Sequence, residues 1–229
     1  MNAPIDLEYA RFNMIEQQIR PWDVLDTSVL ELLSVVHRED FVPLAHKALA
    51  FVDMQVPLKD AADEAMQRGQ SMLEPKVEAR LLQDLHVLPN DKVLEVGTGS
   101  GYMAALLAHR AQRVITMEID GELARTARAN LQKAGITNVE VREADGAKGL
   151  PAEAPFDVIV LSGSVAEVPQ ALLSQLKVGG RLAAIVGFEP VMRTTIVTRT
   201  GEASFTTAQP WDTLAPRLAG FPEPSRFHF

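Results

Sequence analysis

Three glycines at alternating positions, directly after a short apolar run, are the part of this 229-residue chain with the clearest chemical meaning. Val93–Val96 leads into Gly97, Gly99 and Gly101, and the helix-forming run Met103–Ala108 follows. A strand, a glycine-rich turn and a helix form the unit with which α/β folds receive nucleotide-like cofactors. Glycine allows positive φ and close approach of the backbone to a ligand, and the first N–H groups of a helix favour an anion. We therefore expect a cofactor site at this turn.

The spacing of the turn narrows the choice of cofactor. The third glycine of the dinucleotide fingerprint would stand at Tyr102, and no Lys-Ser/Thr pair follows as in a phosphate-binding P-loop. Glu95 places an acid at the end of the strand, where it can face an ammonium group directly or through water. S-adenosylmethionine, whose methionine end carries an amine and a carboxylate, suits this arrangement. A tight turn without a ligand is the alternative reading of the glycines alone.

Acidic residues follow two further apolar runs. Glu118 lies in the second predicted strand, Arg113–Asp120, about 20 residues beyond the first glycine, where an acid is expected to accept from a ribose hydroxyl pair. Asp145 follows the third, Val139–Ala144, and could accept from an adenine amino group. With Glu95, these acids are expected to lie side by side at three neighbouring strand ends.

Composition excludes several classes of function. The chain is 47% hydrophobic and 23% charged, as in soluble globular proteins. Its net charge of −8 argues against general nucleic-acid or anionic-membrane binding. The absence of cysteine excludes disulfides and thiolate metal sites, and the five histidines show no metal-ligand spacing, so we expect no metal. The chain shows no apolar signal segment and no stretch long enough to span a bilayer, which predicts a cytoplasmic protein.

The elements that position these residues alternate from Lys92 onward. After the second and third strands come a fourth at 156–161 and a fifth at 181–186, with helices at 121–134 and 169–177 and a terminal antiparallel hairpin at 193–199 and 203–208. Before Lys92 the patterns predict a helix over 7–20 with Leu7, Phe12, Ile15 and Ile19 on its apolar face, a second helix opened by a capping box at Ser28–Glu31, and a short helix over 45–50. The polar segment 59–68 reads as an exposed insertion or mobile loop, and Pro75 opens a helix with a buried stripe at Val77, Leu81 and Leu85. The tail from Trp211 is expected to be irregular.

Several further stretches resemble the protein-L-isoaspartate O-methyltransferase family, over roughly residues 8–190. They are Arg38–Pro43, Val93–Tyr102, Ala144–Gly146, Ala154–Asp157, Glu167–Pro169 and Leu173–Gly180 with Gly187 beyond. The resemblance implies a Rossmann-like class I methyltransferase: an α/β, doubly wound, mostly parallel sheet with a terminal antiparallel hairpin and a helical N-terminal cap. Residues 1–75 would form the cap and active-site turn, and residues 76–229 the S-adenosylmethionine-binding core.

The resemblance also implies an activity and a set of site residues. Methyl transfer from S-adenosylmethionine to the carboxylate of damaged aspartyl residues in proteins would be the reaction, with an isoaspartyl protein or peptide as partner; it leaves the oligomeric state open. Gln70, Ser162 and Ser164 would lie at the acceptor pocket, and Ser71 at the catalytic turn. The residues implied for the cofactor are Glu95, Gly97, Thr98, Gly99, Ser100, Gly101, Glu118, Asp145 and Gly146.

One departure from the family pattern falls at the acceptor side. The family turn reads roughly Gly-x-Thr-Ile-Ser-x-Pro, whereas this chain reads Gly69 to Pro75 with Ser71 for the threonine, Leu73 for the serine and Glu74 beside it. A leucine cannot donate a hydrogen bond to an acceptor carboxylate, so weak isoaspartyl methylation is expected. The alternatives are a same-fold methyltransferase with another acceptor, a small molecule or RNA, and a non-catalytic cofactor-binding adaptor.

Overall fold

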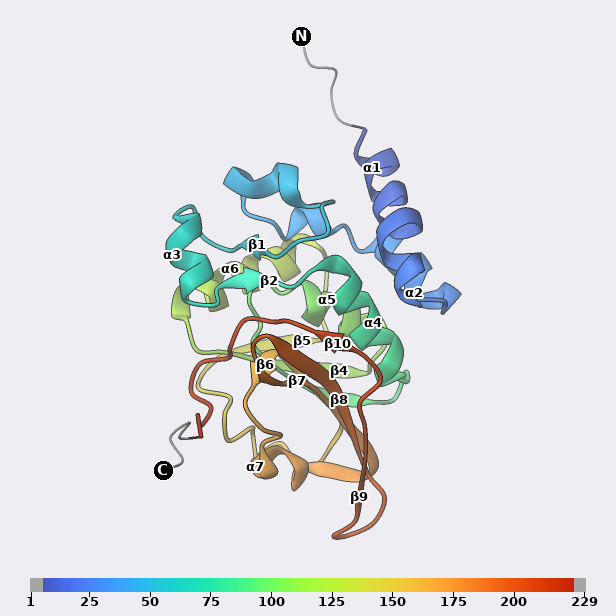
Figure 1. The fold of residues 1–229 in the computed structure, drawn as a ribbon, viewed down its shortest axis with the longest axis vertical. Helices are drawn as coiled ribbons and strands as arrows, with labels where there is room; N and C mark the ends of the chain where they lie inside the picture. Colours follow the sequence, from blue (N-terminus) through green and yellow to red (C-terminus); the bar gives the residue numbers. More distant parts are fainter. Residues whose placement is uncertain (1–5, 225–229) are drawn as a thin grey trace.

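The computed structural model describes residues 6–224 as an α/β fold around one large sheet (Figure 1). The helices are α1 Leu7–Met14, α2 Thr27–Val35, α3 Ala62–Gln67, α4 Pro75–Leu85, α5 Tyr102–Ala108, α6 Gly121–Lys133 and α7 Gln170–Leu173. The strands are β1 Val56–Pro57, β2 Ser71–Met72, β3 Lys92–Val96, β4 Arg113–Glu118, β5 Val139–Glu143, β6 Phe156–Val165, β7 Leu176–Phe188, β8 Val191–Arg199, β9 Phe205–Ala208 and β10 Asp212–Thr213. No helix among these residues is long and apolar enough to cross a membrane.

The sheet runs in the order β10-β8-β7-β6-β3-β4-β5, with β9 also paired to β8. The five strands from β5 to β7 are parallel, and β8 runs antiparallel to β7 and β9. The predicted mostly parallel sheet with a terminal antiparallel hairpin is therefore confirmed. From β3 the sheet grows outward through β4 and β5, and from β6 it grows in the opposite direction through β7. The connections after β3 and β6 therefore leave toward opposite sides, which opens a crevice at the carboxyl ends of these two strands.

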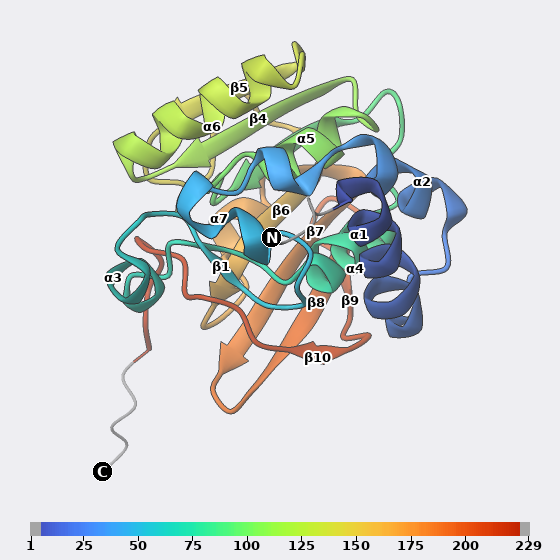
Figure 2. The same ribbon diagram turned by 90° about the horizontal axis from the view of Figure 1, so that it is seen from above.

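Two apolar layers enclose the sheet. Helices α4, α5 and α6 and the N-terminal segments pack on one face, the near face in Figure 2, and α7 with the irregular segment before β6 packs on the other, below the strands in Figure 1. The fully buried stripe Val77, Leu81 and Leu85 fixes α4 against the sheet, as its spacing predicts. The glycine turn thus joins a strand and a helix that are both anchored in the core.

The N-terminal helices differ from the sequence expectation at their ends. The first helix is α only to Met14 and continues as a π-helical segment, Ile15–Ile19, and a 3₁₀ turn that contains Pro21. Of its expected apolar face, Ile15 and Ile19 are buried but Leu7 and Phe12 are exposed. The second helix is capped two residues before its expected capping box, because the Asp26 side chain accepts from the backbone N–H of Ser28. The expected helix at 45–50 is a 3₁₀ helix, Leu44–Leu49.

The expected helix over 169–177 is mostly wrong. Only Gln170–Leu173 is α-helical, and β7 begins at Leu176, so Gly179 and Gly180 lie within the strand. A β-carbon at Gly180 would lie 2.9 Å from the Lys177 carbonyl oxygen and 3.0 Å from that of Asp157. Gly180 therefore permits close backbone packing next to β6, and Gly179 adopts a φ of +86°, whereas the sequence pattern predicted that the pair ends a helix.

The polar segment 59–68 contains an ordered helix. Its centre is α3, whose Ala65 is 1% exposed, and β1 and β2 pair on either side of it. Lys59 donates to Asp120 at 3.0 Å and to Glu122 at 2.8 Å, which ties the segment to the start of α6. The interpretation as an exposed insertion, held at Ala65 and Lys59, is therefore favoured over that of a mobile loop.

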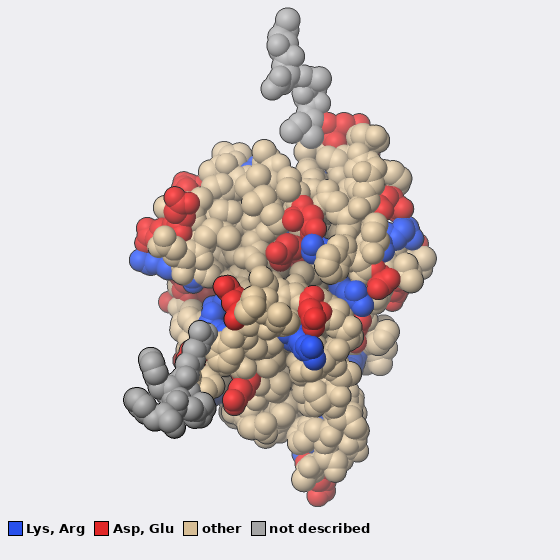
Figure 3. All heavy atoms as spheres, in the orientation of Figure 1, with Lys and Arg blue, Asp and Glu red and all other residues tan. Residues whose placement is uncertain are grey.

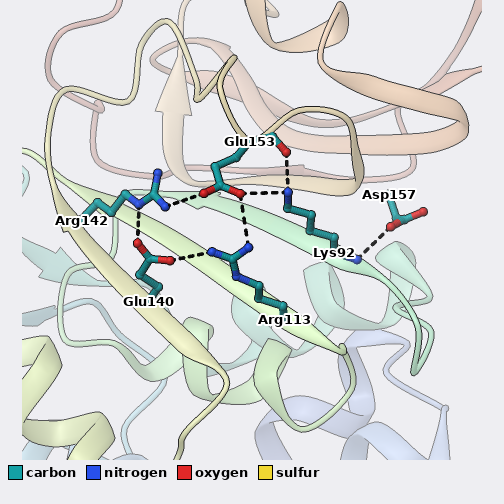
Figure 4. Close-up of polar contacts among 6 residues, drawn as sticks. All are labelled: Lys92, Arg113, Glu140, Arg142, Glu153 and Asp157. Atoms are coloured by element: carbon teal, nitrogen blue, oxygen red, sulfur yellow. Dashed lines mark hydrogen bonds and ion pairs between the residues drawn. The ribbon is translucent and has the colours of Figure 1, made fainter.

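Charged side chains link three neighbouring strands to the loop before β6. Glu153, in the loop before β6, accepts from Arg142 on β5, Arg113 on β4 and Lys92 on β3 (Figure 4). Glu140 bridges the two arginines, at 2.7 Å from Arg113 and 2.6 Å from Arg142. The hydrogen bond from Arg142, with those from its other cationic neighbours, lowers the pKa of Glu153 to about 2.

This network predicts a defined loss of stability in acid. A carboxyl group with a folded-state pKa of about 2 against an ordinary value of 4.5 stabilises the fold above about pH 4.5 and loses that contribution as the pH falls toward 2. Glu153→Gln should lower the urea midpoint at pH 7, and its difference from wild type should shrink steadily below about pH 4.5. Glu31→Gln, on the exposed side of α2, serves as the control. A difference that does not change with pH would contradict this role of Glu153.

Candidate functional site

A cavity opens at the carboxyl ends of β3, β4, β5 and β6, between the glycine turn and two segments that cross above it. Its floor comes from Gly97, Gly99, Glu118 and Ser162. The remaining residues around it are Leu58, Arg68, Gly69, Gln70, Ser71, Val96, Met117, Ile119, Asp120, Leu123, Ala144, Gly146, Arg217, Leu218 and Ala219. Strand ends, the β2 turn and the C-terminal segment therefore share one site.

The glycine turn has the backbone conformation that its composition predicts. Gly97, Gly99 and Gly101 adopt φ of +94°, +53° and +86°, values that side chains of L-residues rarely allow. The backbone N–H of Gly99 donates to Glu118 at 2.8 Å. The second Glu118 oxygen accepts from the N–H of Asp120 at 3.0 Å. These contacts hold the ends of β3 and β4 together.

Glu118 is a buried carboxylate that borders the cavity. Glu118 is only 6% exposed. This burial raises the pKa of its carboxyl group despite the two backbone N–H donors. Each carboxylate oxygen has two lone pairs, so both can still accept from a ligand hydroxyl group. The geometry thus leaves Glu118 able to bind a diol at the floor of the cavity.

A chain of short hydrogen bonds crosses three strands beneath the turn. The Thr116 hydroxyl donates to Glu95 at 2.6 Å, the Ser162 hydroxyl donates to the other Glu95 oxygen at 2.7 Å, and Thr98 lies 2.6 Å from Thr116. Glu95 is fully buried, and burial raises its pKa to about 8, with smaller contributions from the neighbouring Glu78 and Glu118. At neutral pH the group is therefore largely protonated, and a cation bound beside it would favour its carboxylate form.

A smaller cavity adjoins the first on the cap side. It is bordered by Ser71, Leu73, Glu78, Glu95 and Ser162, among others. Arg38 pairs with Glu78 and donates to the Leu73 carbonyl at 2.8 Å, which fixes the turn before α4. Leu73 is 4% exposed, whereas the half-buried Ser71 borders both cavities.

Comparison with known proteins places the chain in a family. The family model for protein-L-isoaspartate(D-aspartate) O-methyltransferase matches residues 10–212. The chain belongs to this family. A protein-L-isoaspartate O-methyltransferase of Methanoculleus marisnigri is 41% identical over 177 residues, which are 77% of each chain. The protein-L-isoaspartate O-methyltransferase 2 of Pelobacter propionicus is 39% identical over 208 residues, which cover 90% of this chain and 89% of the relative.

Solved structures share the fold. A protein-L-isoaspartate O-methyltransferase superposes with a TM-score of 0.76 at 23% identity, over 92% of this chain and 66% of that one. A putative protein-L-isoaspartate O-methyltransferase of Plasmodium falciparum, in complex with S-adenosyl-L-homocysteine, superposes with a TM-score of 0.72 at 17% identity, over 93% and 98% of the two chains. Both support the α/β class I methyltransferase architecture expected from the sequence.

Most residues that the family resemblance singled out gather around the two cavities. Ser100 lies buried in the turn, where its hydroxyl accepts from the N–H of Tyr102, and Gln70 donates to Asp120 at 2.8 Å. Three others lie apart from the cavity walls: Gly101, which packs against Leu131 and Ala127 of α6, and Asp145 and Ser164. Asp145 is exposed and accepts from the N–H of Ala147, while its neighbour Gly146 borders the cavity. Ser164 is fully buried, and its hydroxyl donates to the Ala215 carbonyl at 2.9 Å.

Sequence reasoning missed four residues of the site. Asp120 caps α6 with one oxygen and accepts from Lys59 and Gln70 with the other. Its position two residues after Glu118 could have indicated that it lies at the same strand end. Arg68, Arg217 and Leu218 border the cavity from segments that carry no recognisable motif. Among residues 6–224, no group of three or more acidic or histidine side chains is arranged to hold a metal ion.

The raised pKa of Glu95 predicts how stability depends on alkaline pH. A group whose folded-state pKa is about 8 against an ordinary 4.5 stabilises the fold fully below about pH 4.5, and this contribution is lost as the pH rises through 8. Because each pKa unit is worth about 1.4 kcal/mol, wild type should lose up to a few kcal/mol relative to Glu95→Gln between about pH 5 and 9. Urea unfolding of both proteins across that range measures the difference. Parallel pH profiles would show that Glu95 is ionised in the free protein.

Proposed function

We propose that this protein transfers a methyl group from S-adenosylmethionine to the carboxylate of isoaspartyl residues in damaged proteins. The observation that carries the proposal is the match to the family over residues 10–212, in a chain whose glycine turn lies between two adjoining cavities, one bordered by Glu118 and the other by Glu95. Relatives named for this activity cover most of the chain.

The residues of the larger cavity fit the cofactor. Glu118 would take the ribose hydroxyls with its remaining lone pairs. The backbone at Gly97 and Gly99 would hold the methionine end, and Glu95 would face its ammonium group, whose charge matches the carboxylate form. The apolar surface at Ile119, Leu123, Ala144 and Gly146 offers a place for the adenine ring. When bound, S-adenosylmethionine supplies an electrophilic methyl group.

The acceptor side needs positioning more than acid–base chemistry. An aspartyl carboxylate has an ordinary pKa near ~4, so it is already a nucleophile at neutral pH and needs no general base. Ser71 borders both cavities, so its hydroxyl group is placed to orient a carboxylate, whereas the Ser162 hydroxyl already donates to Glu95 and lines the same side. Holding the acceptor in a water-poor pocket at near-attack distance then accounts for the rate. Residues 1–75 would supply most of this side and residues 76–229 the cofactor side.

Leu73 has a structural role that revises the expectation of weak activity. Its side chain is buried, and its carbonyl is held by Arg38, so the residue stabilises the turn that presents Ser71. The face drawn in Figure 3 has acidic and basic groups interspersed, without the broad basic patch that an RNA acceptor would require. Both points favour an isoaspartyl acceptor.

Methyl transfer to matched peptides tests the acceptor. With labelled S-adenosylmethionine, an isoaspartyl peptide should be methylated and its aspartyl twin should not. Ser71→Ala should lower kcat/KM for the isoaspartyl peptide about ten- to a hundred-fold, because a hydrogen bond to a charged group is worth about 1.5–3 kcal/mol. Ser174→Ala, at the end of α7, should leave it unchanged.

Leu73→Ser separates the two interpretations of the turn. On our proposal it gives no gain in isoaspartyl turnover. Weak wild-type turnover that Leu73→Ser raises would show instead that Leu73 limits the acceptor, as the sequence departure predicts. Failure of both peptides with retained cofactor binding would point to another acceptor or to an adaptor.

Binding of S-adenosylhomocysteine tests the cofactor site independently of any acceptor. Glu118→Ala should raise its Kd about ten- to a hundred-fold, because hydrogen bonds to a buried carboxylate are lost. Isothermal calorimetry measures the effect, and Glu202→Ala on the β8–β9 turn is the control. Equal affinities of the two variants would remove Glu118 from the cofactor site.

A further inference from the structure

A second buried carboxylate, to which the proposed reaction gives no role, borders the smaller cavity. Glu78 lies on α4, is 4% exposed and shares the wall of this cavity with Glu95. Carboxylates are rarely buried this far unless a partner or a ligand offsets the loss of hydration. Glu78 pairs with Arg38, and its place at the cavity wall leaves room for a ligand on its other side.

Of the two charged groups in this ion pair, the carboxylate reaches the cavity. The Arg38 side chain is 0% exposed and borders neither cavity, whereas the Glu78 side chain is 5% exposed. The guanidinium carbon of Arg38 lies 5.4 Å from the centre of the Tyr102 ring, and the Leu73 carbonyl accepts from Arg38 at 2.8 Å. The pair is therefore a dipole whose negative end borders the cavity and whose positive end is enclosed by protein.

Glu78 and Glu95 act together on the charge of a ligand in this cavity. Burial, and to a smaller extent the charge of Glu78, raises the pKa of Glu95 to about 8. Burial also raises the pKa of Glu78 to about 7, and the charge and hydrogen bond of Arg38 oppose that rise. A cation bound in the cavity would stabilise the carboxylate form of both acids, so the smaller cavity favours a positively charged group.

The function proposed above brings a positive charge to the junction of the two cavities. Residues that border both cavities mark this junction; they are Ser71, Gly97, Gly99 and Ser162. With the ribose at Glu118 in the larger cavity and the ammonium group at Glu95 in the smaller one, the sulfur that connects these two parts of the cofactor has to lie between them. That sulfur is a cation in S-adenosylmethionine and is neutral in S-adenosylhomocysteine.

We propose that Glu78 shifts the binding preference of the site toward S-adenosylmethionine by placing negative charge near the sulfonium group. The two ligands differ by one methyl group and one positive charge, so a buried carboxylate distinguishes them mainly by charge. Methyl transfer removes that charge, and Glu78 then no longer attracts the product. The inference rests on the function proposed above, and it gives the same site a means of limiting inhibition by its own product.

Calorimetry with both ligands on full-length variants measures this preference as the Kd of S-adenosylhomocysteine divided by that of S-adenosylmethionine. Glu78→Gln, which keeps the shape of the side chain, should lower this ratio about ten-fold, mainly by weakening S-adenosylmethionine, because the attraction of a buried charge is lost. Glu78→Asp, which keeps the charge, should stay within about three-fold of wild type. Glu74→Gln makes the same charge change at the start of α4, apart from both cavities, and should leave the ratio unchanged.

A double variant separates the charge of Glu78 from that of Arg38. Glu78→Gln alone leaves Arg38 buried without a counter-charge, which lowers stability and would itself repel a sulfonium group. Arg38→Met combined with Glu78→Gln removes both charges, and its ratio should still lie about five-fold or more below wild type. Thermal melting without ligand shows which variants are folded, and the double variant decides the outcome if Glu78→Gln is not.

Two results would overturn this inference alone. One is an unchanged ratio in Glu78→Gln, with both ligands bound by wild type. The other is recovery of the wild-type ratio in the double variant, which would assign the effect of Glu78→Gln to the unpaired Arg38. Failure of wild type to bind either ligand would instead overturn the proposed function, and this inference with it.

Discussion

The hydrogen bond from the Gly99 backbone to the Glu118 carboxylate is the contact on which the site depends. It joins the turn after β3 to the end of β4, and it requires the positive φ that glycine supplies at this position. Through its second oxygen, Glu118 also fixes Asp120, which caps α6 and receives Lys59 and Gln70 from the segment above. The path of the backbone, the start of a helix and the cover of the cavity therefore follow from one buried carboxylate.

Burying Glu95, Glu118 and Glu78 within one region carries an electrostatic cost that the structure only partly offsets. Glu78 has Arg38, while Glu95 has only hydroxyl donors, and burial raises the pKa of Glu78 to about 7 and that of Glu95 to about 8. Buried carboxyl groups of this kind lower the free energy of unfolding relative to apolar residues of similar size. A cationic ligand lowers the cost, since a positive charge beside Glu95 favours its ionised form. The raised pKa thus agrees with a site made for a cation-bearing cofactor.

The sequence predicts the core of this fold well because the core obeys local rules. Strands β3, β4 and β6 are mostly apolar and β5 alternates apolar and charged residues, so their positions could be predicted, and their ends bring Glu95, Glu118 and Gly146 to one edge of the sheet. What failed in the fold depends on tertiary contacts. Gly179–Gly180 reads locally as a helix stop, but Gly180 serves close packing in β7, and Asp26 takes the cap expected at Ser28. The roles of Ser164 and Asp145 at the ligand stay predictions; both residues contact the C-terminal segment, which no local pattern indicates.

The glycines of the motif consequently have two physical reasons to be glycine. Gly97 and Gly99 are both needed for positive φ, but their neighbours differ: a β-carbon at Gly97 would meet Leu218, whereas one at Gly99 would meet Leu58 at 3.1 Å. Leu58 precedes α3, and Leu218 lies in the C-terminal segment after β10. The glycine turn therefore contacts one segment from before the core and one from after it. The glycines of the motif therefore form the floor of the cavity and also leave room for the two segments that cover it. The two covering segments also meet each other at Gly69, where a β-carbon would lie 3.1 Å from the Arg217 carbonyl oxygen, so they form one continuous cover over the cavity.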